Sequence, residues 1–488
     1  MNEHYPRRTG WIVLKFGGTS VANVRNWPEI ARTVEAHLRA GQHPLLVLSA
    51  LAGTTNRLHA LIESWEAGQP TQPHIDHIES LHQTWCQEIG LLGNHLIGQG
   101  LDAIKANLVG SKPGMPLPAP TKAKIMSTGE WLSTQMAAAW LQQTGLPTAW
   151  VDARELLHTK SQAQHSQAYL SAECDFSPNP SLRSRYEALG PTVLVTQGFL
   201  AANAQGETAL LGRGGSDTSA SYLASIFSAD RLEIWTDVPG IFTSNPQAFP
   251  DARLLLNLDY DEAERLAAMG ARVLHPRCIG PVREHQIPLH IRCTQDPELP
   301  TTVIGHSAEA AFEGVKAVLS RSQLGYGEMR AQRPGDPQFV TRSLAGLEAH
   351  DIAWDHMAFS QEHLRFTIDP TLNPLEPEER EALERHFQHF AEGQIRWNKA
   401  SLSLVGKSLR NRLPEISPLM EVMQGQKVYM VSNTPEDMDL TLVLDSQEIK
   451  DVTARVHDSL LAQNLPDHVF GPAWSDLKSL PVPVRVAV

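Results

Sequence analysis

Short runs of β-branched and other apolar residues alternate with amphipathic stretches over the first 300 positions of the chain. The run Trp11–Phe16 predicts a buried strand that ends at two glycines, and residues 45–48 predict the next strand. Between them, residues 23–40 have a helical periodicity that stops at Gly41. Alternation of this kind is typical of an α/β sheet that is wrapped by helices.

The same alternation continues with one interruption. Residues 56–110 have a mostly helical pattern and predict an inserted helical layer, and a further helix is expected over 127–144. Residues 198–211 predict a hairpin with its turn near 204–207. Further strands are predicted at 147–151, 192–195 and 232–235.

The pattern changes after about residue 305, where two copies of one small module are predicted. The first copy contains a strand at 315–320, a helix at 338–349 and a strand-turn-strand unit over 352–368. A similar cycle recurs over 400–461, and residues 369–394 are expected to bridge the two copies. The predicted units are an α/β domain at 1–305, a first module with its connector at 306–394, a second module at 395–465 and a proline-rich linker or tail at 466–488.

The composition fits a globular protein of two or three domains, since 42% of the 488 residues are hydrophobic and 19% are charged. The formal net charge of −13 argues against nucleic acid or an anionic membrane as the main partner. Four cysteines without CxxC spacing exclude a disulfide scaffold and favour the cytoplasm. Neither a signal peptide nor an apolar run of the length of a membrane span is recognisable, so we expect a soluble protein.

The first of three glycine-bearing loops follows the strand 11–16. Lys15 stands at the end of that strand, and Gly17 and Gly18 come directly after it, followed by two hydroxyl residues. Glycines allow backbone N–H groups to approach phosphate oxygens, and the N-terminus of a following helix favours negative charge. The order is not that of a Walker loop, because the lysine precedes the glycines. Alone, the loop is also compatible with a simple tight turn.

The second loop, Leu211–Asp217, has the sequence LGRGGSD and opens a helix that is predicted over 218–226. Ser216 or Asp217 is placed to cap this helix. A turn with a capping residue would explain the glycines. Arg213 points further, because a guanidinium between glycines is well shaped to bind a carboxylate or phosphate.

The third loop, Trp235–Phe242, ends a strand in a polar turn and places an aromatic ring where it can stack on a base, although a plain strand exit has the same pattern. The three loops all follow strands of one α/β region. If the sheet is parallel, they meet at one edge, which is where such folds bind ligands. Together they indicate phosphoryl transfer to a small molecule.

Five motifs in this region resemble those of aspartate kinases, which have the amino-acid-kinase fold. They are KFGGTSV at 15–21, STGE at 127–130, LGRGGSD at 211–217, WTDVPGI at 235–241 and MGARVLHP at 269–276. The resemblance covers about residues 10–305. It implies phosphorylation of the side-chain carboxylate of L-aspartate by MgATP, the first step toward lysine, threonine and methionine. It also implies a mainly parallel sheet sandwiched by helices, followed by two α+β ACT-like modules.

The resemblance implies a role for each matching residue. Lys15 would neutralise charge on the transferred phosphoryl group, and Asp217 would orient Lys15. The residues implied to bind substrate are Arg213 for the α-carboxylate, Glu130 for the ammonium group, and Ser49, Thr55 and Ser216 for polar atoms. Those implied to bind the nucleotide are Lys15, Gly17, Gly18, Gly214, Gly215, Thr236, Asp237, Phe242 and Arg272. Mg²⁺ would be held by the ATP phosphates, and we assign no metal ligand from the protein.

The nucleotide segment departs from the family pattern at four positions. Phe242, Asn245, Gln247 and Arg272 stand where the family commonly has Tyr, Asp, Arg and Lys. Phe242 keeps an aromatic ring, Gln247 removes a cation, and Arg272 keeps the charge with a different geometry. These changes concern nucleotide affinity rather than the type of reaction.

The two modules after residue 315 resemble the ACT modules that bind an end-product amino acid and form the dimer in this family. Asp355 and Ser360 align with its effector strand-turn-strand unit. We therefore expect a homodimer and, as hypotheses, feedback by lysine or threonine or a purely structural role of the modules. The alternatives to an active aspartate kinase are a catalytically weakened amino-acid sensor and a kinase of another small amino acid.

Overall fold

The computed structural model describes residues 10–160, 166–271, 273–306, 312–350, 352–373, 375–461 and 465–479. An eight-stranded sheet in the order β3-β4-β2-β1-β7-β10-β11-β9 organises the first 305 residues. All its neighbouring strands pair in parallel except β10 with β11. The strands are β1 (Trp11–Phe16), β2 (His43–Leu48), β3 (Thr148–Trp150), β4 (Val193–Gln197), β7 (Arg231–Thr236), β9 (Asn257–Leu258), β10 (Leu289–Cys293) and β11 (Thr302–Ile304).

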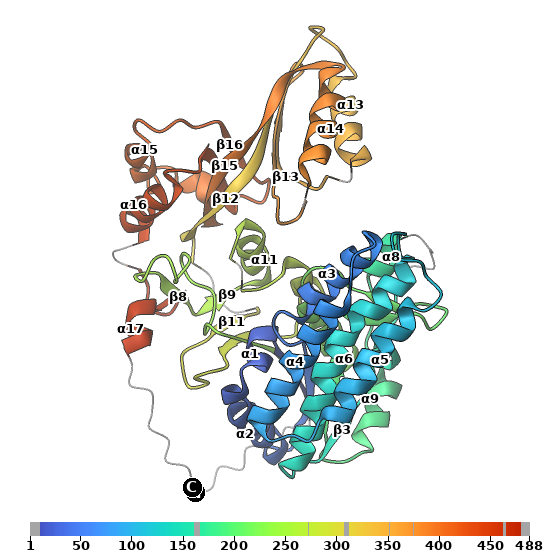
Figure 1. Cartoon of the computed structure of the whole chain (residues 1–488). Coiled ribbons are helices and arrows are strands. Elements are labelled where there is room, and N and C mark those ends of the chain that lie inside the picture. Colours follow the sequence, from blue (N-terminus) through green and yellow to red (C-terminus); the bar gives the residue numbers. More distant parts are fainter. Residues whose placement is uncertain are drawn as a thin grey trace, which may run out of the picture.

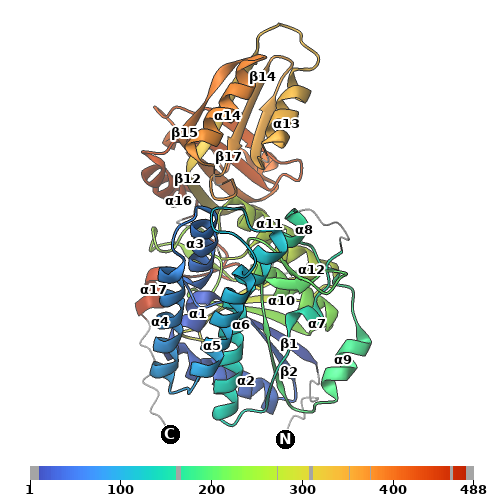
Figure 2. The same ribbon diagram turned by 45° about the vertical axis from the view of Figure 1, so that its right-hand side comes forward.

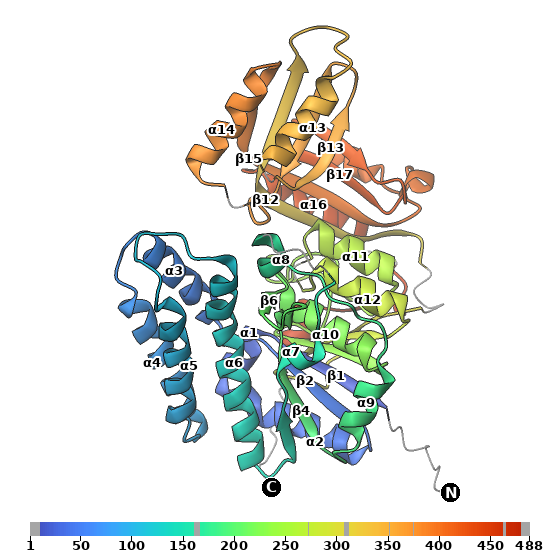
Figure 3. The ribbon, with the colours of Figure 1, turned by 90° about the vertical axis from the view of Figure 1, so that its right-hand side faces the viewer.

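Alternating side chains of the central strands bury both faces of this sheet. In β1, Ile12 and Leu14 join one hydrophobic cluster, whereas Trp11 and Val13 join another. The strand is therefore apolar throughout, as a strand covered on both faces must be. Figure 3 shows α3 to α6 beyond one face and α10 and α12 against the other. The sequence-based expectation of a mainly parallel sheet between helices is confirmed.

The helices that were predicted in this domain lie close to their expected positions, with α6 starting about two turns earlier than expected. The inserted layer over 56–110 consists of α3 (Thr54–Glu66), α4 (Gln72–Ile89) and α5 (Asn94–Leu108). The predicted hairpin is β5 (Leu200–Ala202) with β6 (Thr208–Leu210). The other helices are α1 (Gly18–Ala22), α2 (Trp27–Arg39), α6 (Ala119–Gln143), α7 (Ala153–Leu156), α8 (Ser166–Leu170), α9 (Pro180–Glu187), α10 (Gly215–Ile226), α11 (Tyr260–Met269) and α12 (Ile279–Glu284).

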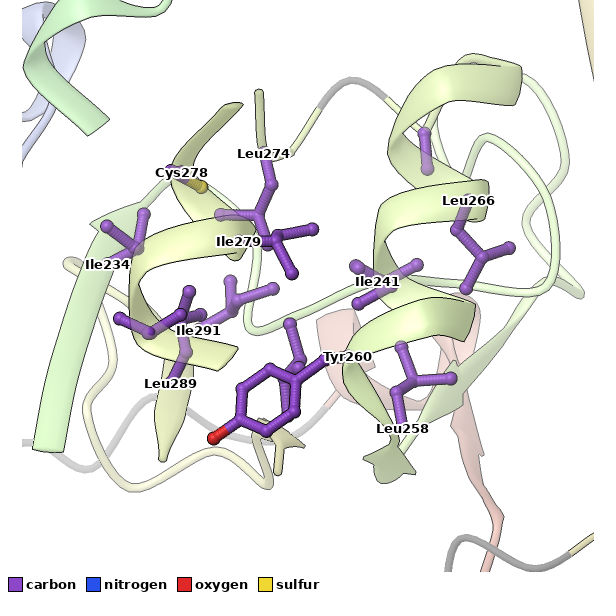
Figure 4. Close-up of a cluster of buried hydrophobic side chains, with 14 of the residues drawn as sticks. Ile234, Ile241, Leu258, Tyr260, Leu266, Leu274, Cys278, Ile279, Leu289 and Ile291 are labelled. Atoms are coloured by element: carbon purple, nitrogen blue, oxygen red, sulfur yellow. The ribbon is translucent and has the colours of Figure 1, made fainter. Parts of the chain in front are cut away.

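The part of the sheet that contains β7 and β10 packs against α11 and α12. Figure 4 shows Ile234 of β7 and Ile291 of β10 beside Ile279 of α12, with Tyr260 and Leu266 of α11 in the same cluster. These five side chains are at most 2% exposed. This packing fixes the carboxyl ends of β7 and β10 relative to the helices around them.

A six-stranded antiparallel sheet in the order β13-β14-β12-β15-β17-β16 forms most of the second half. It lies with α13 and α14 at one end of the molecule, beyond α8 and α11 (Figure 2). Its strands are β12 (Gly314–Ala331), β13 (Trp354–Phe359), β14 (His363–Ile368), β15 (Ala391–Lys407), β16 (Met430–Asn433) and β17 (Asp439–Asp445). Its helices are α13 (Phe339–Ala349), α14 (Pro377–Gln388), α15 (Pro418–Val422) and α16 (Ile449–Leu461).

Two long strands join the modules that the sequence predicted as separate units. β12 and β15 pair from Ala331↔Ala391 to Gly314↔Lys407, with register shifts between them. The predicted strand at 315–320 is therefore too short, and the predicted connector 369–394 contains α14 and the start of β15. The α+β character of both modules is confirmed, and they share one continuous sheet.

The end of the described chain returns to the first domain. β18 (Phe470–Ala473) pairs with β8 (Arg253–Leu255), and α17 (Trp474–Ser479) follows it (Figure 1). Phe470 is fully buried, and Arg253 donates hydrogen bonds to the carbonyl groups of Phe470 and Gly471. The expectation of an extended linker from residue 466 is therefore wrong for 466–479. Over the described ranges, no helix has the length and apolar character that crossing a membrane requires.

Candidate active site

A cavity of about 420 Å³ opens at the carboxyl ends of the central strands β1 and β2. It is where the sequence placed the ligand site, because the loops after these parallel strands meet at one edge of the sheet. The predicted residues that line it are Lys15, Gly18, Ser49, Thr55, Glu130, Arg213, Gly214, Gly215, Ser216 and Asp217. The structure thus brings together residues that are up to 202 positions apart along the chain, as between Lys15 and Asp217.

Lys15 and Asp217 form the charged centre of the cavity. The Nζ atom of Lys15 lies 2.5 Å from Oδ1 of Asp217, and the two side chains are 11% and 14% exposed. Lys15 comes from the buried strand β1, whereas Asp217 comes from the first turn of α10. The acid therefore fixes the direction of the ammonium group while leaving it at the cavity wall, a contact compatible with the orienting role that the resemblance implies for Asp217.

The backbone at Gly214 explains why α10 begins where it does. Gly214 has φ of 67° and precedes the first helical residue, Gly215, without a side-chain cap. A Cβ at Gly214 would come within 2.2 Å of the His275 ring, so only glycine fits. The prediction that Ser216 or Asp217 caps a helix starting at 218 is wrong. Both lie inside the first turn, which leaves their side chains available to the cavity.

Glu130 supplies a buried carboxylate from the long helix α6. It is 3% exposed, its Oε1 accepts a hydrogen bond from the N–H of Ala50 at 3.3 Å, and its Oε2 has no partner within the described chain. Burial raises the pKa of Glu130 to about 8. Gly129 allows this approach, because its missing side chain brings α6 close to Ala50 and Thr54. An unpaired buried carboxyl oxygen at a cavity is suited to receive a cation.

Arg213 lines the cavity at its exposed rim. Its side chain is exposed, and Nη1 donates a hydrogen bond to the main-chain carbonyl of Thr371, in the loop after β14. Ser49 and Thr55 line the same cavity from the loop after β2 and the start of α3. The structure therefore places all five predicted substrate residues around one space.

The glycines after β1 make close contacts that side chains would prevent. A Cβ at Gly18 would lie 2.8 Å from the carbonyl oxygen of Ala50, and Gly17 precedes the first residue of the short helix α1. Thr236 ends β7, the neighbour of β1, and Asp237 follows it; the Thr236 hydroxyl donates to Asp237 Oδ1 at 3.0 Å. They lie outside the set of residues that lines the cavity. Arg272 is outside the described residues.

Phe242 does not occupy the position that was expected of it. Its side chain is 3% exposed and packs with Val238, Leu254 and Leu477. Its ring meets Trp474 of α17 edge-on, with centroids 5.5 Å apart. The prediction that Phe242 stacks on a base is therefore wrong in this structure, because the returning C-terminal segment covers the ring.

The predicted effector residues are separated. Asp355, near the start of β13, pairs with Arg321, whereas the exposed Ser360 follows the end of the same strand. Five extended residues span roughly 17 Å. A single amino acid is too small to reach both side chains, so the structure does not combine them into one site.

Phe199 lines the cavity but was not recognised in the sequence. It is a non-glycine residue with φ of 73°, and its N–H donates to the Ser219 hydroxyl at 2.9 Å. Its position beside Gly215 depends on the hairpin folding back onto α10, and no local pattern signals that. Among the described residues, no group of three or more His, Cys, Asp or Glu side chains is arranged to hold a metal ion.

Comparison with known proteins assigns this architecture to a family. The family model described as "Amino acid kinase family" matches residues 10–293. The chain is 36% identical over 322 residues to the bifunctional aspartokinase/homoserine dehydrogenase of Haemophilus influenzae, an alignment that covers 64% of this chain but only 38% of that protein. It is 26% identical to lysine-sensitive aspartokinase 3 of Escherichia coli, covering 92% of this chain and 99% of the other.

Solved structures agree on the fold over nearly the whole chain. Escherichia coli aspartokinase III in complex with aspartate and ADP has a TM-score of 0.77 at 24% identity, and covers 92% of this chain and 99% of its own. The same enzyme in complex with lysine and aspartate has a TM-score of 0.74. The likeness therefore includes the second half of the chain as well as the kinase-type domain.

Proposed function

The chain belongs to the amino acid kinase family, and we propose that it is an aspartate kinase, which transfers the terminal phosphoryl group of MgATP to the side-chain carboxylate of L-aspartate. The observation that carries this proposal is the single cavity that joins the Lys15–Asp217 pair to the buried carboxyl group of Glu130 and the guanidinium of Arg213. Aspartokinases aligned over 92% of the chain support the choice of amino acid.

In this proposal one side of the cavity binds the zwitterion of the amino acid and the other side binds the phosphoryl group. The ionised form of Glu130 receives the ammonium group of an amino acid, and the Arg213 guanidinium receives its α-carboxylate. The remaining acidic group of L-aspartate then points toward Lys15. Ser49, Thr55 and Ser216 supply hydroxyl groups for the polar atoms between these ends.

The reaction needs alignment and charge neutralisation rather than a strong base. A side-chain carboxylate oxygen of aspartate forms a bond to the terminal phosphorus of ATP while the bond from that phosphorus to the oxygen of ADP breaks. The carboxylate is already ionised at neutral pH, so no proton has to leave it. Lys15 offsets the charge that spreads over the transferred group, and Asp217 keeps its ammonium in place.

The nucleotide is held by the loops around the phosphoryl side. Backbone N–H groups beside Gly17, Gly18, Gly214 and Gly215 face the phosphates in this proposal. Thr236, Asp237 and Arg272 complete the nucleotide contacts, whereas Phe242 is not assigned to the base. Mg²⁺ bound to the ATP phosphates would supply neutralisation of their charge, and no protein side chain is assigned as its ligand.

Regulation and assembly are part of the proposal. The ACT-like modules bind an amino-acid effector, lysine or threonine, and join two copies of the chain. Trp354 and Phe359 support an interface, because they are 50% and 68% exposed on the edge strand β13. The four cysteines are free and buried, which supports the cytoplasm as the location.

A substrate panel tests the proposed function. The purified chain is incubated with MgATP and hydroxylamine, and with L-aspartate, L-glutamate or no amino acid, and the hydroxamate of the acyl phosphate is measured. Turnover with L-aspartate, but not with L-glutamate or without an amino acid, supports an aspartate kinase. Turnover with another amino acid identifies a different kinase of the family, and ATP binding without any hydroxamate points to an amino-acid sensor.

A further inference from the structure

The loop Asp369–Asn373 of the antiparallel-sheet region contacts Arg213 at the rim of the candidate active site. Its Thr371 carbonyl accepts a hydrogen bond from Nη1 of Arg213, a residue 158 positions away along the chain. Arg213 lines the same cavity as Lys15 and Glu130. A main-chain group of one domain therefore holds the guanidinium that the proposed substrate needs in the other.

The loop is stiffened by its own side chains. Oδ1 of Asp369 accepts hydrogen bonds from the N–H and the hydroxyl of Thr371, at 2.8 and 2.6 Å. The Asn373 side chain accepts a hydrogen bond from the N–H of Ala353 and donates one to its carbonyl, both at 2.8 Å. Asp369 and Asn373 are only 7% and 4% exposed, so the residues that hold the Thr371 carbonyl in place are themselves buried.

Asp369 also belongs to a buried network of charged side chains. The second carboxylate oxygen of Asp369, Oδ2, lies 3.4 Å from Nη1 of Arg321, and Nη2 of Arg321 pairs with Asp355. Arg321 is 8% exposed and sits in β12, and a Cβ at Gly270 would lie 2.9 Å from its Cγ. The Arg321 side chain thus packs against the end of α11 and fixes the loop at the same time.

The substrate and the loop compete for the same group. A carboxylate binds a guanidinium best through two parallel N–H donors, and the contact with Thr371 removes Nη1 from the end-on pair. A charged acceptor forms a stronger hydrogen bond than a neutral carbonyl, so a bound α-carboxylate displaces the loop. The free energy lost with this contact therefore reduces the net free energy of substrate binding.

We propose that the loop Asp369–Asn373 is an intrachain competitor for the substrate's α-carboxylate, and that its contact with Arg213 weakens binding of the amino acid. This inference rests on the proposed function, because it assigns Arg213 to the carboxylate. The Arg321–Asp369 pair sets the strength of the competition by holding the loop in place.

Steady-state kinetics of full-length variants test the competition. Asp369→Asn removes the negative charge that pairs with Arg321. Thr371→Val removes only the hydrogen bond that the Thr371 hydroxyl donates to Asp369 within the loop. Both are expected to lower KM for L-aspartate about three- to tenfold, the equivalent of one ordinary hydrogen bond, without changing kcat. Thr434→Val is the matched control, because the Thr434 hydroxyl bonds to Asp439 in the same way outside the site. Its KM is expected to equal that of the unaltered protein.

Amide hydrogen exchange gives a second readout that does not depend on turnover. Saturating L-aspartate is expected to speed exchange at the N–H of Thr371 and Asn373 as the loop leaves Arg213. An unchanged KM in both variants, or exchange that slows or stays the same with L-aspartate, overturns the inference. If the unaltered chain makes no aspartyl hydroxamate, the proposed function fails, and that result is distinct from normal turnover with an unaltered KM in the variants.

Discussion

The ammonium group of Lys15 and the carboxylate of Asp217 lie 2.5 Å apart, although one belongs to a central strand and the other to the first turn of a helix 202 positions later. The pair forms only because β1 and α10 meet at the edge of the sheet where the cavity opens. Its two members have different tasks in the proposed mechanism. Lys15 faces the transferred phosphoryl group, and Asp217 keeps it there.

Replacing Lys15 tests this division of tasks. Lys15→Ala is expected to lower kcat about 10²- to 10³-fold, because it removes a fixed charge from the transferred group. Lys122→Ala is the control, since Lys122 also pairs with an acid, Glu66, at 2.8 Å but outside the cavity. Steady-state hydroxamate assays measure both. A kcat of Lys15→Ala within threefold of the control would remove Lys15 from the mechanism.

The buried carboxyl group of Glu130 predicts a pH-dependent KM. Its pKa of about 8 means that the group is mostly protonated below that pH in the free protein, whereas binding an ammonium group needs the ionised form. KM for L-aspartate is therefore expected to fall by roughly tenfold per pH unit as pH rises toward 8. Glu130→Gln is expected to raise KM and to abolish this dependence.

The raised pKa of Glu130 also makes the free energy of unfolding depend on pH. Because the pKa in the folded state lies above the ordinary value of 4.5, the folded protein keeps a proton on Glu130 between about pH 4.5 and 8 that the unfolded chain has lost. The contribution of Glu130 to the free energy of unfolding is thus lost as pH rises through this window. Thermal unfolding of Glu130→Gln should show a smaller loss than the unaltered chain, and equal losses would argue against the raised pKa.

The returning C-terminal segment predicts a large effect far from the cavity. Phe470 is fully buried, and its strand β18 pairs with β8 of the first domain. Phe470→Ala is therefore expected to lower the free energy of unfolding by about 3–5 kcal/mol. Val431→Ala, at a side chain that is 57% exposed, should change it by no more than about 0.5 kcal/mol. Urea unfolding of both variants provides the comparison. Equal stability would show that residues 466–479 leave the first domain in solution.

The ACT-like half predicts a response to end-product amino acids. Millimolar lysine or threonine is expected to reduce activity about fivefold or more through a site outside the cavity. Initial rates at fixed MgATP and L-aspartate, with D-lysine as a control for ionic effects, measure it. A flat response to both amino acids would leave the modules with a structural role.

Much of the first domain could be predicted from the sequence, because its signals are local. A run such as Trp11–Phe16 has to be a doubly covered strand, and the polar loops after parallel strands have to meet at one edge. Lys15 reaches the cavity in this way. Arg213 and Asp217 instead follow β6 of the antiparallel β5–β6 hairpin, and Glu130 lies on α6, so the family resemblance rather than the loop pattern indicated Glu130.

The features that were missed depend on distant partners. Phe242 has the pattern of an exposed stacking ring, but Trp474 covers it from 232 positions away. The strand β12 continues through the polar stretch 320–323 because β15 pairs with it on both sides of a register shift. Asp355 has the pattern of a ligand-binding acid, yet Arg321 already pairs with it.

The most direct measurement follows an oxygen atom from the amino acid to phosphate. The chain is incubated with MgATP, hydroxylamine and L-aspartate that carries ¹⁸O in its side-chain carboxylate, and the released phosphate is analysed by mass spectrometry. We expect phosphate with one ¹⁸O atom, because the carboxylate oxygen attacks phosphorus and stays with it when hydroxylamine cleaves the acyl phosphate. Phosphate without the label, or no phosphate at all, would contradict it.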